Sequence, residues 1–167
     1  MRKKLYPWAV ALPQGFSVKC ATLWKLGELK APGTWGSVAG ILLYALLFDG
    51  MGFWRYVIFA TLLAYLAVGI CDTAERALRL RDPGCIILDE FAAIPFCFLP
   101  IFSSYSMWGV FFVFLLFRFF DIKKPSIIYK MQDLEGGLGC VADDVVAALA
   151  TCITLNLFGF VFNFIYV

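Results

Sequence analysis

Five long apolar segments, separated by short polar stretches, dominate the hydrophobic pattern of this chain. They cover residues 36–48, 53–70, 86–102, 105–120 and 141–167. A helix that crosses a bilayer needs roughly 20 apolar residues, within a range of about 17–25. The pattern therefore predicts an all-α, polytopic membrane protein with about four to five membrane helices.

The third segment differs from the others. It begins with Asp89 and Glu90, and Pro95 and Pro100 interrupt its helical hydrogen bonding. It is therefore compatible with a re-entrant segment as well as with a full span. The first and fourth segments are short, so we expect their ends to lie at the membrane interface or to include flanking residues.

The composition supports membrane insertion. Of the 167 residues, 62% are hydrophobic and 16% are charged, whereas a soluble domain carries about 45–50% apolar and about 25% charged residues. No cleavable signal peptide is expected near Met1, so insertion would rely on the internal helices. The six cysteines form no CxxC pair and there is no histidine, which argues against a zinc site.

The basic residues predict an orientation. If the five segments alternate across the bilayer, all of the 14 lysines and arginines except Arg55 fall on one side, and the positive-inside rule makes that side cytoplasmic. Residues 1–30 are then an N-terminal cytoplasmic segment, residues 31–167 form the membrane domain, and the C-terminus lies outside. A re-entrant third segment would change the side of everything that follows it.

The same alternation places most of the carboxylates together at cytoplasmic helix ends. Carboxylates near hydrocarbon are costly and by default mark function. Two ionised neighbours repel unless a cation bridges them, so Mg²⁺ is the natural partner of an oxygen-rich group. Basic residues in the same stretches suit an anionic substrate. The acidic and basic residues of this predicted site are Asp89, Glu90, Asp121, Asp143, Asp144, Arg118, Lys123 and Lys124.

Each candidate also has a simpler interpretation. Asp89 and Glu90 would be favourable near the positive end of a helix, and Asp143 and Asp144 could act as helix caps. Arg118 and Asp121 could form an intrahelical ion pair, while Lys123 and Lys124 could be an ordinary topology signal. Thr34 and Ser37 could bind phosphate at a helix N-terminus or could simply cap it. The helical spacing of Asp72, Glu75, Arg76, Arg79 and Arg81 is typical of a solvated extension of the second segment.

Four stretches taken together resemble the phosphatidylglycerophosphatase A family. They are APGTWGS, LDEF within DPGCIILDEF, FRFFDIKKPSII and GGLGCVADD, and the resemblance covers roughly residues 29–149. It implies a Mg²⁺-dependent, membrane-embedded phosphatase that converts phosphatidylglycerophosphate to phosphatidylglycerol in bacteria. Together with the orientation predicted from the basic residues, this gives an enzyme of the bacterial inner membrane whose active site faces the cytoplasm. The family positions match Asp89, Glu90, Arg118, Asp121, Lys124, Pro125, Asp143 and Asp144.

The residue types narrow the chemistry independently. The chain has no histidine, no DxDxT motif and no cysteine followed by five residues and an arginine. These absences exclude a His-dependent lipid phosphatase, an aspartyl-phosphate intermediate and a cysteinyl-phosphate intermediate. Direct hydrolysis by a metal-activated water remains. We expect the five carboxylates to hold one or two Mg²⁺ ions, with Glu90 as ligand or general base. Arg118, Lys123 and Lys124 would bind the phosphate, helped by Thr34 and Ser37.

Two other functions stay open from the sequence. A small membrane transporter could use the carboxylates as a cation site, but its charges should lie near the middle of the membrane. A CDP-alcohol phosphotransferase is also metal-dependent, but its DG-containing aspartate motif is absent. No nucleic-acid partner is expected, and the sequence leaves the oligomeric state open.

Overall fold

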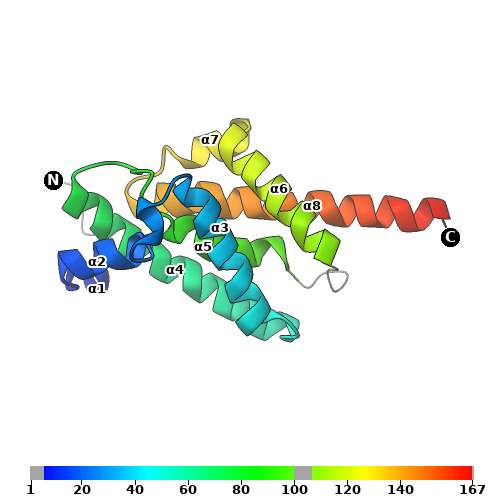
Figure 1. Cartoon of the computed structure of the whole chain (residues 1–167), viewed down its shortest axis with the longest axis horizontal. Helices are drawn as coiled ribbons and strands as arrows, with labels where there is room; N and C mark the ends of the chain where they lie inside the picture. The colour runs from blue at the N-terminus through cyan, green and yellow to red at the C-terminus, as the bar shows by residue number, and fades with distance from the viewer. Residues whose placement is uncertain (1–5, 100–106, 167) are drawn as a thin grey trace.

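The chain folds into helices joined by turns. The computed structural model describes residues 6–99 and 107–166, and no strand occurs among them, so the all-α prediction is confirmed for this part of the chain. Figure 1 shows the arrangement. The helices are α1 (Pro7–Val10), α2 (Gln14–Ala21), the 3₁₀ turn η1 (Leu26–Glu28), α3 (Pro32–Leu43), the π-helical turn η2 (Tyr44–Phe48), α4 (Phe53–Leu78), α5 (Leu88–Cys97), α6 (Met107–Lys123), α7 (Ser126–Met131) and α8 (Gly137–Tyr166).

Fewer helices than predicted have the length and composition of a membrane span. Within the described residues two qualify, Phe53–Leu78 and Gly137–Gly159, against the four to five expected. The α3–η2 helix covers only Pro32–Phe48, and α6 has 17 residues. The α5 helix has 10 residues, about 15 Å at 1.5 Å per residue, whereas a bilayer core is about 30 Å thick. Pro95 lies near the end of α5, and Pro100, the second proline of the predicted break, lies outside the described residues.

The short α5 helix lies at the centre of the fold. It packs against α3, α4 and α8, and Figure 1 shows it between the long α4 and α8 helices. Ala92, Ala93 and Ile94 are fully buried. The Tyr56 hydroxyl on α4 donates a hydrogen bond of 2.7 Å to the Pro95 carbonyl. Helix α5 is therefore a core helix whose first turn is held in a fixed place by its neighbours.

Small residues let α3 approach α5 closely. A Cβ atom added at Gly40 would lie 2.8 Å from Ile94 Cβ and 2.9 Å from the Phe91 carbonyl oxygen, and one added at Gly36 would lie 2.8 Å from the Ile87 carbonyl oxygen. Real Cβ atoms do not approach so closely. The glycines therefore set the distance between the two helices.

The N-terminal helices belong to the same packed structure. Helices α1 and α2 lie against α4, where Gly69 leaves room for the Trp8 ring. The Ile87 amide donates a hydrogen bond of 2.9 Å to the Ala21 carbonyl, which ties α2 to the start of α5. The division at residue 30 stays a prediction, and Arg2, Lys3 and Lys4 of the predicted cytoplasmic segment lie outside the described residues.

We predict that Gly40→Ala destabilises the protein, because the new methyl group overpacks the α3–α5 contact, which typically costs about 1–3 kcal/mol. Alanine is the better helix former by about 1 kcal/mol, so helix propensity alone would raise the stability. A net loss of stability would therefore come from the overpacked α3–α5 contact. The measurement is the midpoint of thermal unfolding of the purified protein. The matched control is Gly15→Ala, since a Cβ atom there meets nothing within 4 Å. Equal midpoints for the two variants would contradict the close packing.

Candidate active site

Three helix ends bring the predicted acidic residues to one cavity. The first turn of α5 carries Asp89 and Glu90, α6 ends near Asp121, and the second turn of α8 carries Asp143 and Asp144. All five carboxylates line a cavity of about 170 Å³. Asp89, Asp121, Asp143 and Asp144 are buried. The structure thus brings together side chains that lie up to 55 positions apart in the sequence.

Two basic side chains accompany these carboxylates. Arg118 Nη1 lies 2.6 Å from Asp121 Oδ2 and 3.6 Å from Glu90 Oε1. Lys124 lines the cavity and its Nζ lies 2.5 Å from Asp143 Oδ2. Although burial alone would lower the pKa of Lys124, the hydrogen bond to Asp143 and the surrounding carboxylates raise it above its usual range. Lys124 therefore stays a cation at any physiological pH.

The centre of the cavity holds an excess of negative charge. One oxygen each from Asp89, Glu90 and Asp144 lies within 4.8 Å of the others. Burial, followed by the nearby acidic groups Cys140, Glu90 and Asp144, raises the pKa of Asp89 well above its usual range. Burial also raises the pKa of Glu90, opposed by its hydrogen bond with Asp89 and by the charge of Arg118. Without a bound cation, Asp89 and Glu90 therefore keep their protons to a higher pH than ordinary carboxyl groups do.

Two buried carboxylate oxygens of the cavity lack a hydrogen bond. Glu90 Oε2 and Asp143 Oδ1 are buried and have no donor among the described residues. A buried acceptor without a donor costs about 1–3 kcal/mol, and more when it is charged. Oxygen atoms of carboxylates are the ligands that Mg²⁺ prefers. The residues present therefore fit a divalent cation bound among Asp89, Glu90 and Asp144, with Asp143 beside it.

Glycines at the starts of α3 and α8 allow the close packing around the cavity. A Cβ atom at Gly33, in the first turn of α3, would lie 2.8 Å from Arg118 Nη1 and would collide with Glu90 Oε1. At the start of α8, Gly136 has a φ of +63° and lies against the Asp72 carboxylate. Gly137 approaches the α4 backbone at Val68 and Asp72 with no room for a side chain. These contacts fix where Glu90, Arg118 and the α8 carboxylates lie.

Four predicted site residues are not among those that line the cavity. Arg118 reaches it only through its contacts with Asp121 and Glu90. The Ser37 hydroxyl is fully buried and donates a hydrogen bond of 2.8 Å to the Gly33 carbonyl within α3. Thr34 is half-buried, and no side chain caps α3. Lys123 is exposed, next to the cavity-lining Lys124. A phosphate-binding role for these four residues stays a prediction.

The structure also brings in residues that the sequence did not single out. Asp82 and Cys140 line the cavity, and the Cys140 thiol donates a hydrogen bond of 2.8 Å to Asp89 Oδ2. Both residues lie within the motif stretches DPGCIILDEF and GGLGCVADD, which was the available signal. The interpretation of Asp72 and Glu75 as solvated was wrong, because both are buried, at 1% and 3% exposure. Asp72 pairs with Arg76 at 2.9 Å, and its burial follows from the packing of α8 on α4.

Backbone strain occurs at two cavity residues. Asp82 and Lys124 have φ values of +46° and +41°. This left-handed region costs a residue other than glycine roughly 1–2 kcal/mol. Strain of this kind concentrates at functional sites. Asp82 and Lys124 both line the cavity.

Comparison with known proteins identifies relatives over most of the chain. The family model described as phosphatidylglycerophosphatase A matches residues 19–159. A Haemophilus influenzae protein named phosphatidylglycerophosphatase A is 39% identical over 126 residues, covering 75% of this chain and 77% of the relative. An Escherichia coli protein of the same name is 28% identical over 77% of this chain and 74% of the relative.

A third relative has a different name. A Bacteroides thetaiotaomicron protein, named provisionally as a phosphatidylinositol-3-phosphatase, is 32% identical over 75% of this chain and 81% of the relative. No solved structure matches the chain. All four motif stretches of the sequence lie inside the matched residues 19–159.

We predict that the metal-free protein becomes less stable as the pH rises from about 5 to 8. The pKa values of Asp89 and Glu90 are raised in the folded protein, so the folded state binds more protons than the unfolded state, whose values lie at about 3.9 and 4.3. The stabilising protons are fully present below those values and are lost as the pH rises through the folded ones. The measurement is the unfolding midpoint in EDTA across this range.

Asp89→Asn should flatten this pH dependence, because the amide is neutral at every pH. Asp49→Asn, at an exposed position that does not line the cavity, should leave it unchanged. A slope that is the same in the wild type and in Asp89→Asn would contradict the assignment of a retained proton to this group.

Proposed function

The chain belongs to the phosphatidylglycerophosphatase A family, and on that premise we propose that it hydrolyses phosphatidylglycerophosphate to phosphatidylglycerol and phosphate. The predicted family and the predicted enzyme class, a phosphatase, are confirmed by the same comparisons. Two of the relatives carry the name of this activity. The observation that carries the proposal is the cavity lined by carboxylates from α5, α6 and α8 and by Lys124, with Arg118 paired to two of those carboxylates.

Mg²⁺ is the proposed cofactor. Asp89, Glu90 and Asp144 would hold it, with Asp121 and Asp143 completing the oxygen-rich surroundings. The fit rests on the clustered oxygens and on Glu90 Oε2 and Asp143 Oδ1, which lack donors. When bound, Mg²⁺ would offset the negative charge of the carboxylates and polarise the phosphate.

The basic residues would hold the substrate phosphate. Arg118 presents a guanidinium between Glu90 and Asp121, with its planar group suited to two phosphate oxygens. Lys124, which is paired with Asp143, supplies a second positive charge. Both cations are held in place before substrate arrives, so charge that develops on the phosphate oxygens meets donors that need little rearrangement.

Glu90 is the proposed general base. A carboxylate has two oxygens, so one oxygen of Glu90 can face the cation while the other accepts a proton from the attacking water. The water oxygen forms a bond to phosphorus, the bond from phosphorus to the ester oxygen breaks, and the departing alkoxide takes up the proton that Glu90 received from the water. The products are the free alcohol and inorganic phosphate.

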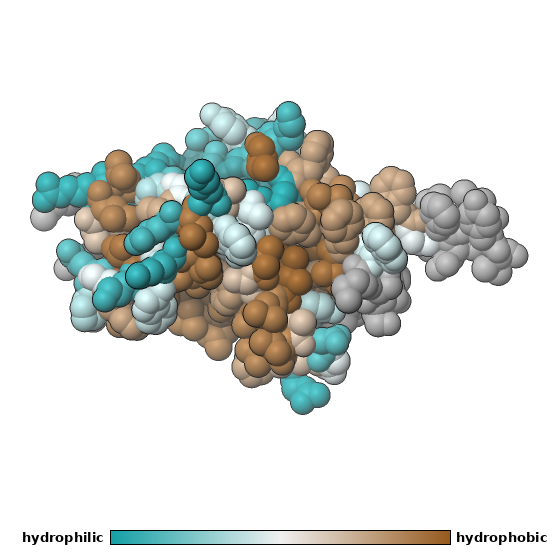
Figure 2. Space-filling view, viewed as in Figure 1, coloured by the Kyte–Doolittle hydropathy of each residue, from teal (hydrophilic) through white to brown (hydrophobic). Residues whose placement is uncertain are grey.

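A lipid substrate and a membrane location are supported by the surface. Large apolar side chains are exposed on several helices, among them Leu46 at 72%, Trp54 at 76% and Trp108 at 73%. Figure 2 shows apolar side chains gathered over α3, while hydrophilic ones gather around α2 and α7. Exposed apolar area of this extent is unusual for a soluble monomer. We propose a multi-pass protein of the bacterial inner membrane whose helices include α4 and α8.

The helix directions support a proposed orientation. Helices α3, α5 and α8 begin at the carboxylate cavity, and α4 and α6 end near it. The basic residues predicted on the cytoplasmic side flank these same ends, so we propose that the cavity faces the cytoplasm. An apolar groove of about 370 Å³ between α3 and α6, lined by residues that include Val38, Ile41 and Phe111, would accept an acyl chain. The transporter alternative gains no support, because the carboxylates gather at one end of the helices.

We predict that Asp144→Asn lowers phosphate release from phosphatidylglycerophosphate by more than about a hundredfold. Mutating a residue that only hydrogen-bonds to a metal ligand typically lowers activity or metal affinity 10- to 100-fold, and loss of a ligand itself should cost more. The measurement is release of inorganic phosphate by the purified enzyme with Mg²⁺. The matched control, Asp49→Asn, lies outside the cavity and should keep full activity. Full Mg²⁺-dependent activity of Asp144→Asn would show that this residue is wrongly assigned.

Mg²⁺ should also stabilise the EDTA-treated protein, and more strongly at pH 8 than at pH 5. The cation must displace the protons that the raised pKa values of Asp89 and Glu90 retain at low pH. Binding to the folded state raises the unfolding midpoint by mass action. The midpoint is measured with and without Mg²⁺ at both pH values. If the shift is absent, or is as large in Asp144→Asn as in the wild type, the proposed cation site is wrong.

A further inference from the structure

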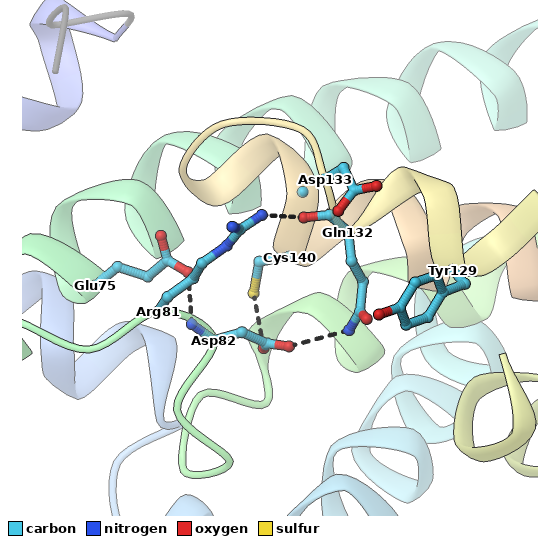
Figure 3. Close-up of a pocket in the computed structure, with 8 residues that line it drawn as sticks. Glu75, Arg81, Asp82, Tyr129, Gln132, Asp133 and Cys140 are labelled. Atoms are coloured by element: carbon cyan, nitrogen blue, oxygen red, sulfur yellow. Dashed lines mark hydrogen bonds between the residues drawn. The ribbon is translucent and has the colours of Figure 1, made fainter.

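A second polar cavity lies beside the carboxylate cavity. Its volume is about 320 Å³, and it shares Asp82 and Cys140 with its neighbour. Figure 3 shows the side chains that line it, which come from the end of α4, from the loop that follows, from α7 and the turn after it, and from α8. The other lining side chains are Glu75, Arg81, Tyr129, Gln132 and Asp133.

Hydrogen bonds hold the wall of this pocket in place. The Asp82 amide donates a bond of 2.7 Å to Glu75 Oε1. The Arg81 guanidinium donates to the carbonyls of Gln132 and Leu134, which ties the loop after α4 to the turn between α7 and α8. The pocket is thus formed by segments that are far apart in the sequence and fixed to one another.

The chemistry of the lining suits hydroxyl groups. Glu75, Asp82 and Asp133 provide carboxylate acceptors, whereas Arg81 is the one cation among the pocket-lining residues. Asp82 receives only long contacts, 3.5 Å from Gln132 Nε2 and 3.6 Å from Cys140 Sγ, so its oxygens can accept further hydrogen bonds. An excess of carboxylates repels a second phosphate but accepts hydrogen bonds from an alcohol.

We propose that this pocket binds the hydroxylated alcohol to which the cleaved phosphate is attached. The inference rests on the proposed phosphatase function. A phosphate in the first cavity places its ester oxygen, and the alcohol beyond it, in an adjoining space, and the pocket adjoins at Asp82 and Cys140. Its volume equals that of about ten water molecules, which accommodates a glycerol unit. The Gln132 amide, 3.5 Å from Asp82, and the Tyr129 side chain, which also lines the pocket (Figure 3), would select a polyol.

The test compares two substrates in the same detergent micelles. Phosphatidylglycerophosphate carries a free hydroxyl on the alcohol that leaves, whereas phosphatidic acid carries none. Gln132→Leu and Tyr129→Phe should each lower kcat/KM for phosphatidylglycerophosphate roughly three- to tenfold, the effect of one lost hydrogen bond. The value for phosphatidic acid should stay within about twofold of the wild type, since it makes no such bond.

The matched control is Gln14→Leu, the same substitution at an exposed position that lines neither cavity. Tyr129 is 61% exposed, so Tyr129→Phe keeps the test valid if Gln132→Leu fails to fold. Equal losses on both lipids, or none on either, would overturn the polyol pocket while leaving the phosphatase function in place. A wild-type enzyme that releases phosphate from neither lipid would overturn the proposed function and this inference with it.

Discussion

The mutual repulsion of buried carboxylates is the constraint on which the rest of this structure depends. Asp89, Asp143 and Asp144 are almost fully buried, and Glu90 lies beside them. An isolated carboxylate in such surroundings is very costly unless it is paired, protonated or bound to a metal. The described structure satisfies part of this demand with Arg118 and Lys124. The remainder, at Glu90 Oε2 and Asp143 Oδ1, is what a bound cation and a substrate would resolve.

That constraint explains features of the fold that stability alone does not favour. Close approach of α3 to α5 at Gly33 and Gly36, and of α8 to α4 at Gly137, is needed to bring the helix ends together. The left-handed backbone at Asp82 and Lys124 adds a further cost. The core around α5 offsets these costs with well-packed residues such as Ile94 and with the hydrogen bond from Tyr56 to Pro95. The packed core around α5 thus stabilises the strained backbone and the buried charges of the carboxylate cavity.

The sequence predicted the carboxylate cavity well and its surroundings poorly. Asp89, Asp121 and Asp144 each lie at or near a helix end within a glycine- or charge-rich motif, so their convergence follows from helix alternation. The burial of Asp72 and Glu75 could not be predicted, because helical spacing alone does not reveal that Gly136 and Gly137 pack against that face of α4.

Local hydrogen bonding and helix length account for two other differences. Ser37 has the residue type of a phosphate ligand, yet a hydroxyl in a helix also bonds to the carbonyl four residues earlier, and here it does. The third apolar segment covers residues 86–102, but its helix ends at Cys97, soon after Pro95. An apolar run therefore identified a core helix rather than a span.

The one-ended placement of charge also suits the proposed reaction. A lipid phosphatase has to hold an anionic headgroup in a polar site while the acyl chains stay in an apolar environment. In this fold α3 and α6 flank an apolar groove lined by Ile41 and Phe111, and their polar ends meet where Gly33 lies against Arg118. The same two helices would therefore contact both parts of the lipid. This arrangement would let binding of the acyl chains help to position the phosphate, which is how contacts remote from the reacting bond contribute to catalysis.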